Sequence, residues 1–202
     1  MKLLILGNSL TRHAPAPQIG WHGDWGMAAS TREHDFVHRL CTKLEEAGVT
    51  VDLRFGNVAD FERNPAETDG AYFADDLAFA PDVLVLRICE NTPADKYAEF
   101  AAAYESLIRS FRANPCCTVF AVGPFWENGT METLLHEASD KGGAVWLSLS
   151  SLHGDLSCQA TGQYEHPGVA SHPSDRGMEA IADIIFGGIK EAGLLAYTPN
   201  PN

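Results

Sequence analysis

The chain is 202 residues long and 45% hydrophobic, which fits one globular domain over residues 1–202 with a core of its own. Asp and Glu outnumber Lys and Arg by 27 to 14, so the formal net charge is −13. That charge repels nucleic-acid phosphates and anionic membrane surfaces, and we expect neither as a partner. The sequence also lacks an apolar run of about twenty residues, the length that spans a membrane.

The cysteines give a prediction about the compartment. There are 5, with no Cys-x-x-Cys pair among them. An odd count without paired spacing favours free thiols in a reducing compartment over a disulfide framework. The apolar stretch before Gly7 is shorter than the hydrophobic region of a signal peptide. We therefore expect a cytoplasmic protein, or a secreted or periplasmic one if a leader has been trimmed.

Apolar runs of strand length alternate along the chain with segments of helical spacing. We expect strands at Lys2–Leu6, Val49–Phe55, Val83–Ile88, Thr118–Val122 and Ala144–Leu147. Apolar residues recur at steps of three and four in four further segments, which predicts helices at Phe36–Ala47, Ala94–Ala113, Thr130–Lys141 and from about Ser174 to Ile189. Strands that alternate with helices indicate βαβ units. The fold class is therefore α/β, with five strands in a three-layer α/β/α sandwich.

Three long irregular segments, 11–32, 57–80 and 148–173, follow the ends of predicted strands. The carboxyl ends of parallel strands meet at one edge of the sheet, so we expect these segments to gather there. Open α/β sheets bind their ligands at this edge. Loops of such length within a compact domain are usually functional.

A serine follows the first strand directly, in the tetrapeptide Gly7-Asn8-Ser9-Leu10. A short buried strand that ends in Gly and then Ser places a hydroxyl at the ligand-binding edge of the sheet. A serine nucleophile needs a base within hydrogen-bond reach and donors for the oxyanion that forms. Most serines in such a tetrapeptide are turn residues, so the partners of Ser9 decide its role.

His172 and Asn91 are the candidate partners. His172 is the best base, because it stands just before the last helix on a loop that Pro173 stiffens. Asn91 is the best side-chain donor, because it follows the strand Val83–Ile88 and its amide is aimed at the same edge. The conjunction of hydroxyl, imidazole and amide predicts a catalytic pair of Ser9 and His172.

These three blocks, in this order, resemble the GDSL-type SGNH hydrolase family. Gly7-Asn8-Ser9-Leu10 matches its first block with Asn8 in place of Asp, Glu90-Asn91 is similar to its third block, and His172-Pro173 to its fifth. The resemblance covers nearly the whole chain. It implies a flavodoxin-like five-stranded parallel sheet in the order 2-1-3-4-5. It also implies ester or acyl-transfer chemistry without a metal or an organic cofactor.

The same resemblance implies roles for individual residues. Ser9 would attack the ester and His172 would shuttle the proton, while the Ser9 backbone N–H and the Asn91 side chain would line the oxyanion hole. The family adds a backbone N–H from a glycine of its second block. Gly56, directly after the second strand, and Asp60, in the following loop, are the two positions that fit.

The sequence departs from the family pattern at the residue that orients the histidine. The family has an Asp three residues before the His, and Val169 stands there. In a Ser-His-Asp triad the acid fixes the His tautomer, and replacing it costs about 10⁴ in rate. Either a backbone carbonyl holds His172, which leaves a dyad, or another carboxylate does. Glu90 is the leading substitute, and a salt bridge to Arg87 is the alternative use of that side chain.

A loop beyond the serine interleaves aromatic and polar residues with glycines. Aromatic faces on such a loop suit sugar rings or acyl groups, and its polar side chains suit hydroxyls. The alternative is an aromatic plug that packs the loop onto the sheet. The candidate substrate-binding residues are Trp21, His22, Asp24, Trp25 and, after the fourth strand, Trp126.

His34 and His38 stand four residues apart, a spacing that can bind a metal, but no convincing third ligand accompanies them and we expect no metal.

The sequence thus predicts a serine esterase that hydrolyses an acyl ester of a small or carbohydrate-like substrate through an acyl-enzyme. Acetyl is the first choice for the acyl group. An acyltransferase would use the same residues. A non-catalytic binding protein of the same fold is the alternative from another class. The oligomeric state is not specified by the sequence.

Overall fold

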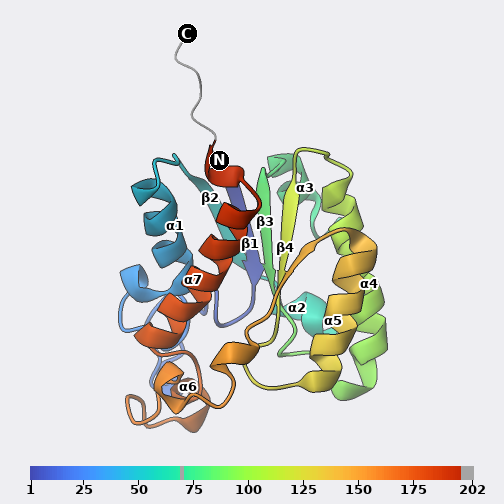
Figure 1. Cartoon of the computed structure of the whole chain (residues 1–202). Helices are drawn as coiled ribbons and strands as arrows, with labels where there is room; N and C mark the ends of the chain where they lie inside the picture. The colour runs from blue at the N-terminus through green and yellow to red at the C-terminus, as the bar shows by residue number, and fades with distance from the viewer. Residues whose placement is uncertain (69–70, 197–202) are drawn as a thin grey trace.

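A computed structural model of the chain describes residues 1–68 and 71–196. It contains one five-stranded parallel sheet in the order β2-β1-β3-β4-β5, which confirms the predicted topology. The strands are β1 (Lys2–Gly7), β2 (Asp52–Asn57), β3 (Val83–Arg87), β4 (Thr118–Val122) and β5 (Val145–Leu147). All strands therefore end at the same edge of the sheet, which is the lower edge in Figure 1.

Helices cover both faces of the sheet and complete the predicted three-layer sandwich. In Figure 1, α1 and α7 lie on one face, and α4 and α5 lie on the other. The α-helices are α1 (Phe36–Glu46), α2 (Ala59–Arg63), α3 (Ala74–Phe79), α4 (Tyr97–Arg112), α5 (Gly129–Gly142), α6 (Pro167–Ala170) and α7 (Asp175–Glu191). Short 3₁₀ helices are formed by Pro17–Ile19, Arg32–His34, Ala94–Lys96, Ser150–Leu152, Leu156–Cys158 and Leu194–Ala196.

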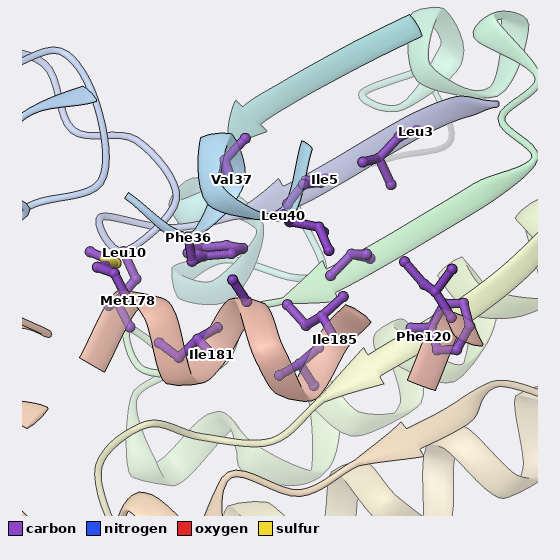
Figure 2. Packing of buried hydrophobic residues seen from close by; sticks show 14 of the residues in the cluster. Leu3, Ile5, Leu10, Phe36, Val37, Leu40, Phe120, Met178, Ile181 and Ile185 are labelled. Atoms are coloured by element: carbon purple, nitrogen blue, oxygen red, sulfur yellow. The ribbon is translucent and has the colours of Figure 1, made fainter. Parts of the chain in front are cut away.

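The alternation of side chains along β1 divides the core in two. Leu3 and Ile5 point toward α1 and α7, where they pack among residues such as Phe36 and Ile185 (Figure 2). The side chains between them, Leu4 and Leu6, point to the other face. There they join the buried residues of α4 and α5. A central parallel strand is buried on both faces, which explains its uninterrupted apolar sequence.

The second strand begins later than its apolar sequence predicts. Val49 donates its backbone N–H to the carbonyl oxygen of Leu44, and Gly48 adopts a positive φ of 85°. These residues therefore close the end of α1, as a glycine after a helix commonly does. Pairing with β1 starts only at Asp52, opposite Lys2.

Two of the segments expected to be irregular contain short helices. Segment 57–80 holds α2 and α3, and segment 148–173 holds α6. Helices of four to six residues are too short to give a clear apolar period. The helix α6 lies toward the edge at which β1 ends, as expected of a segment that follows a strand. The helix α3 instead lies at the opposite edge in Figure 1, because it leads into the start of β3, and the carbonyl oxygen of Phe79 accepts a hydrogen bond from Nζ of Lys2. In the part of the chain that the structure describes, we find no helix with the length and apolarity to cross a bilayer.

Candidate active site

Ser9 lies in a tight turn at the carboxyl end of β1. The backbone carbonyl oxygen of Asn8 accepts hydrogen bonds from the N–H groups of Thr11 and Arg12, and that of Ser9 accepts from Met27. A Cβ on Gly7 would stand 1.7 Å from Oγ1 of Thr11. The close packing of this turn therefore requires a glycine at position 7.

His172 lies between α6 and α7 and faces the serine. Its Nε2 is 2.8 Å from Oγ of Ser9, and its Nδ1 is 2.6 Å from the carbonyl oxygen of Gly168. A carbonyl oxygen only accepts hydrogen bonds, so Nδ1 carries the proton of the neutral ring. Nε2 is then free to accept the hydroxyl proton of Ser9, which is the arrangement that a general base needs.

The short helix α6 makes the Gly168 carbonyl available. Within α6, the backbone N–H groups of Ala170 and Ser171 bond to carbonyls that precede Gly168, and that of His172 bonds to Val169. The Gly168 carbonyl therefore accepts from side chains, which are the hydroxyl of Ser171 at 3.1 Å and the imidazole of His172. The last carbonyls of a helix lack intrahelical partners and carry its partial negative charge. A backbone oxygen thus occupies the place of the triad carboxylate.

Val169 is fully buried, although it stands where the family has its acid. The side chain packs in an apolar cluster with Ala16, Trp21, Met27, Ala28 and Ala160. A carboxylate at this position would be buried without an ionic partner, at a cost of several kcal/mol. The apolar residue is therefore explained by the packing of α6.

The surroundings of His172 favour its neutral form. Burial lowers the pKa of His172 to about 4, although the hydrogen bond to Gly168 acts in the opposite direction. The indole of Trp126 packs edge-on against the imidazole, with 5.3 Å between ring centroids, and its Nε1 donates to the carbonyl oxygen of Ser171. Trp126, which was expected to bind substrate, packs against the histidine and is not among the described residues that line the cleft.

Glu90 does not replace the missing acid. Its carboxylate forms an ion pair with Arg87, at 2.6 Å, and accepts hydrogen bonds from Nδ2 of Asn8 and the N–H of Phe125. Burial alone would raise the pKa of Glu90, but the charge and hydrogen bond of Arg87 bring it below its usual range. The structure brings Gly168, and not Glu90, to Nδ1 of His172.

A second buried carboxylate, Glu62, was not singled out in the sequence. It lies on α2 with no exposed surface. Its oxygens accept hydrogen bonds from Nδ2 of Asn8 at 2.9 Å, from the N–H of Cys89 and from Nδ2 of Asn91. A glutamate in a short helix is usually a surface residue, so no pattern in the sequence indicates this position.

A cleft of about 400 Å³ opens beside the serine. It is lined by Ser9, His13, Ile19, Met27, Asn57, Ala59, Asp60, Arg63, Asn91, His166, Gly168 and His172. The structure therefore brings Ser9, His172 and Asn91 to one cavity. Of the two second-block candidates, Asp60 lines the cleft and is itself exposed, whereas Gly56 belongs to β2 and pairs with Leu6.

The aromatic loop packs on itself. The rings of Trp21 and Trp25 meet edge-on at 5.6 Å, and Trp21 also contacts Tyr164. Asp24 forms a paired hydrogen bond with Arg12, and His22 is exposed. None of the four loop candidates is among the described residues that line the cleft, so the alternative of an aromatic plug fits better than substrate binding.

The two histidines with metal-like spacing have separate partners. His34 contacts Ser30 of the loop before α1 and Asp175 at the start of α7, and His38 contacts Asp35, which caps α1. Residues 1–68 and 71–196 contain no group of 3 or more His, Cys, Asp and Glu side chains that could hold a metal ion. These contacts anchor the ends of α1 and α7.

Comparison with solved structures finds the same fold in proteins described as esterases. An acetyl xylan esterase superposes with a TM-score of 0.62 at 17% identity, over 94% of this chain and 100% of that one. The psychrotrophic esterase EstA from Pseudoalteromonas sp. gives a TM-score of 0.65 at 13% identity, over 95% and 97% of the two chains.

A family two carbohydrate esterase from Cellvibrio japonicus gives a TM-score of 0.60 at 18% identity, over 96% of this chain and 62% of that one. The chain has the SGNH hydrolase fold. The resemblance seen in the sequence blocks is thereby confirmed at the level of the fold. Neither the protein-family models nor the curated proteins gave a match to this sequence.

Proposed function

We propose that this protein is a serine ester hydrolase that removes a small acyl group, acetyl in the first place, from a small or carbohydrate-like alcohol. The observation that carries the proposal is the 2.8 Å contact between Oγ of Ser9 and Nε2 of His172, with Nδ1 held by Gly168. The fold shared with esterases, one of which is an acetyl xylan esterase, supports it.

The first half-reaction forms an acyl-enzyme. Oγ of Ser9 attacks the ester carbonyl carbon while Nε2 of His172 takes the hydroxyl proton. The negative oxygen that forms is stabilised by the backbone N–H of Ser9 and the side-chain amide of Asn91, with the backbone of Asp60 the second-block candidate. When the tetrahedral intermediate collapses, His172 gives its proton to the departing alkoxide, which leaves as the free alcohol.

The second half-reaction reverses these roles. A water molecule gives its proton to Nε2 of His172 and attacks the acyl carbonyl, and the same donors stabilise the new oxyanion. Collapse releases the carboxylic acid and returns the proton to Ser9. Because the Gly168 carbonyl holds the required tautomer, the dyad keeps the ring correctly protonated. It lacks the full negative charge that an acid would place beside the imidazolium.

The cleft supports a small acyl group and a polar alcohol. The volume of about 400 Å³ lies in the range of small-molecule sites and includes the space for the alcohol. The apolar side chains of the cleft lining, those of Ile19 and Met27, suit the methyl of an acetyl group. The polar lining, which includes Arg63 and His166, suits a hydroxyl-bearing alcohol.

Hydrolysis of a p-nitrophenyl ester series from acetate to octanoate tests the proposal. We expect the acetate to be preferred and Ser9→Ala to reduce the rate to background. Labelling by a fluorophosphonate should map to Ser9 and be absent from the variant. A wild-type rate no greater than that of Ser9→Ala would favour the non-catalytic binding protein. Partition of the acyl group to an added alcohol rather than to water would identify an acyltransferase.

A further inference from the structure

Glu62 collects hydrogen bonds from the chain segments that build the catalytic centre. One of its donors is Asn8, the residue before Ser9. The other two are the N–H of Cys89 and the side-chain amide of Asn91, which follow β3. The carboxylate therefore joins the turn of the nucleophile to the segment that carries the candidate oxyanion donor.

The charges around Glu62 make the burial of its ionised carboxylate unfavourable in free energy. Glu62 and Glu90 accept from the same nitrogen, Nδ2 of Asn8, and Arg87 supplies the cation of this buried group. Burial and the charge of Glu90 raise the pKa of Glu62 well above its usual range. When both carboxylates are ionised, the two carboxylates and the one guanidinium carry a net negative charge. Burying that charge costs free energy unless hydrogen-bond donors compensate for the lost hydration.

The thiol and the phenol that lie in this cluster stay neutral. Burial raises the pKa of the Cys89 thiol and of the Tyr104 hydroxyl, which α4 brings beside Arg87 and Glu90. Arg63, on the same helix as Glu62, faces the oxygen of Asn91 from the exposed side at 3.4 Å. Within this cluster, Glu62 is therefore the group whose charge changes at a pH above the range in which carboxylates ordinarily titrate.

We propose that Glu62 is a positioning residue of the oxyanion hole. By accepting one of the two N–H bonds of Asn91, its carboxylate fixes the amide plane and leaves the second N–H for the substrate oxyanion. By accepting from Asn8, it also holds the turn on which the backbone N–H of Ser9 lies. This role rests on the proposed esterase function and deepens it. It accounts for a buried acid that contacts no substrate.

The familiar Asp of the first block would not fit this arrangement. At position 8 an amide donates to both Glu62 and Glu90 through Nδ2 and accepts from the N–H of Leu10 through Oδ1. An aspartate has no donor to offer and would bring a third carboxylate to the pair. The asparagine at position 8 is therefore the residue that the buried Glu62 requires as a hydrogen-bond donor.

Glu62→Gln tests the proposal on the purified protein with p-nitrophenyl acetate. We expect kcat to fall about 10–100-fold, below the 10²–10³ that loss of a whole oxyanion donor costs, because Asn91 remains but is no longer held. KM should stay within about threefold, since the oxyanion exists only in the transition state. The exposed Glu67→Gln is the matched control and should leave both constants unchanged.

Two further readouts separate positioning from a merely structural role. If Glu62 acts through Asn91, Glu62→Gln should lower kcat by a smaller factor in the Asn91→Ala background than in the wild type, and the remaining loss is the part that acts through Asn8. The wild-type kcat should also fall to a lower plateau as Glu62 is protonated, and Glu62→Gln should remove that step. If Glu62→Gln does not fold, Glu62→Asp keeps the charge, shortens the reach and should show the same loss of kcat.

The outcomes distinguish this inference from the function on which it rests. A wild-type protein that neither hydrolyses the ester nor reacts with a fluorophosphonate overturns both. An active wild type whose Glu62→Gln variant keeps its kcat overturns the role of Glu62 alone. So does a double variant in which the two losses multiply, because Glu62 would then act independently of Asn91.

Discussion

Nδ1 of His172 lies 2.6 Å from the carbonyl oxygen of Gly168, four residues earlier in the chain. This contact determines which nitrogen of the ring carries the proton, and it does so with a backbone atom. The tautomer is therefore fixed without a side chain at the position of the family's acid. What the carbonyl does not supply is a full negative charge, so the histidine is protonated less readily than in a triad.

The pH dependence of kcat/KM should reflect this environment. Because burial lowers the pKa of His172 to about 4, the base stays neutral well below the usual histidine value of about 6.5. Activity should therefore be lost completely only as pH falls through about 4, when a protonated Nε2 no longer accepts the proton of Ser9.

This loss of activity at acidic pH can be measured as the acetate released from a neutral ester after quenching. Such an assay needs no indicator whose own protonation changes with pH. The comparison to make is with Glu62→Gln, which should retain the limb of His172 and lose the step assigned to Glu62. A complete acidic loss centred near 6.5 in both proteins would contradict the desolvated histidine.

The buried pair of Arg87 and Glu90 should dominate the stability of the cluster. Arg87→Leu leaves Glu90 and Glu62 without a cation, and removal of one partner of a buried pair costs about 3–5 kcal/mol. Urea unfolding at neutral pH measures the change. Arg109→Leu is the control, because its pairing with Glu105 is on the surface of α4 and is worth at most about 1 kcal/mol.

Equal losses for the two arginine variants would show that burial adds nothing to the pair. An intermediate loss for Arg87→Leu that grows with pH would assign the cost to the carboxylates it leaves behind. The free energy of unfolding of the variant should improve as pH falls, because protonation of Glu62 removes one of the two unpaired charges.

Asn8→Asp, which restores the usual family residue, should destabilise the protein. The new carboxylate faces Glu62 and Glu90 without a donor between them, and we expect a loss of about 3 kcal/mol or more at pH 8. The folded state raises the pKa of this acid, so the loss should shrink as pH falls. Asn114→Asp is the control, because the oxygen that accepts from Cys116 is retained.

In the double variant Asn8→Asp/Glu62→Gln, the new amide at position 62 can donate a hydrogen bond to the new carboxylate at position 8. This variant should therefore recover part of the lost stability. If Asn8→Asp unfolds no more easily than Asn114→Asp at pH 8, the amide does not hold the two carboxylates apart. A loss that grows as pH falls would contradict the repulsion as its cause.

The parts that the sequence predicts are those with local signals. The apolar runs and periods predicted the strands and the main helices, because burial on both faces demands an uninterrupted apolar strand such as β1. The order of the strands in the sheet came from the resemblance of the sequence blocks to a known family. Ser9 and Asn91 were found because a hydroxyl and an amide that follow strands carry recognisable chemistry, and His172 because an imidazole on the loop before the last helix is a candidate base. Their mutual approach required the fold, and the cleft shows it.

The parts that the sequence misses depend on distant contacts. A carbonyl oxygen such as that of Gly168 exists at every residue, so its selection as a partner of His172 leaves no mark on the sequence. The burial of Glu62 depends on donors in the segments that follow β1 and β3, which lie far from it along the chain. Glu90 was placed beside the wrong partner, because proximity in sequence to Asn91 says nothing about its distance from His172.

Val169→Asp tests whether the missing acid can simply be restored. Val169 is fully buried among apolar side chains, and the Gly168 carbonyl already occupies Nδ1 of His172. We therefore expect no gain in kcat and a loss of stability of several kcal/mol from a buried, unpaired carboxylate. Val169→Ala, which removes only volume, should cost about 2 kcal/mol.

Both variants are measured by urea unfolding and by hydrolysis of p-nitrophenyl acetate. A stable Val169→Asp protein with a higher kcat would mean that the new carboxylate displaces Gly168 and completes a triad, contrary to the packing of α6. Equal destabilisation of the two variants would assign the effect to lost volume alone. The difference between them at pH 8 isolates the cost of the charge, and it should diminish as pH falls because protonation neutralises the buried acid.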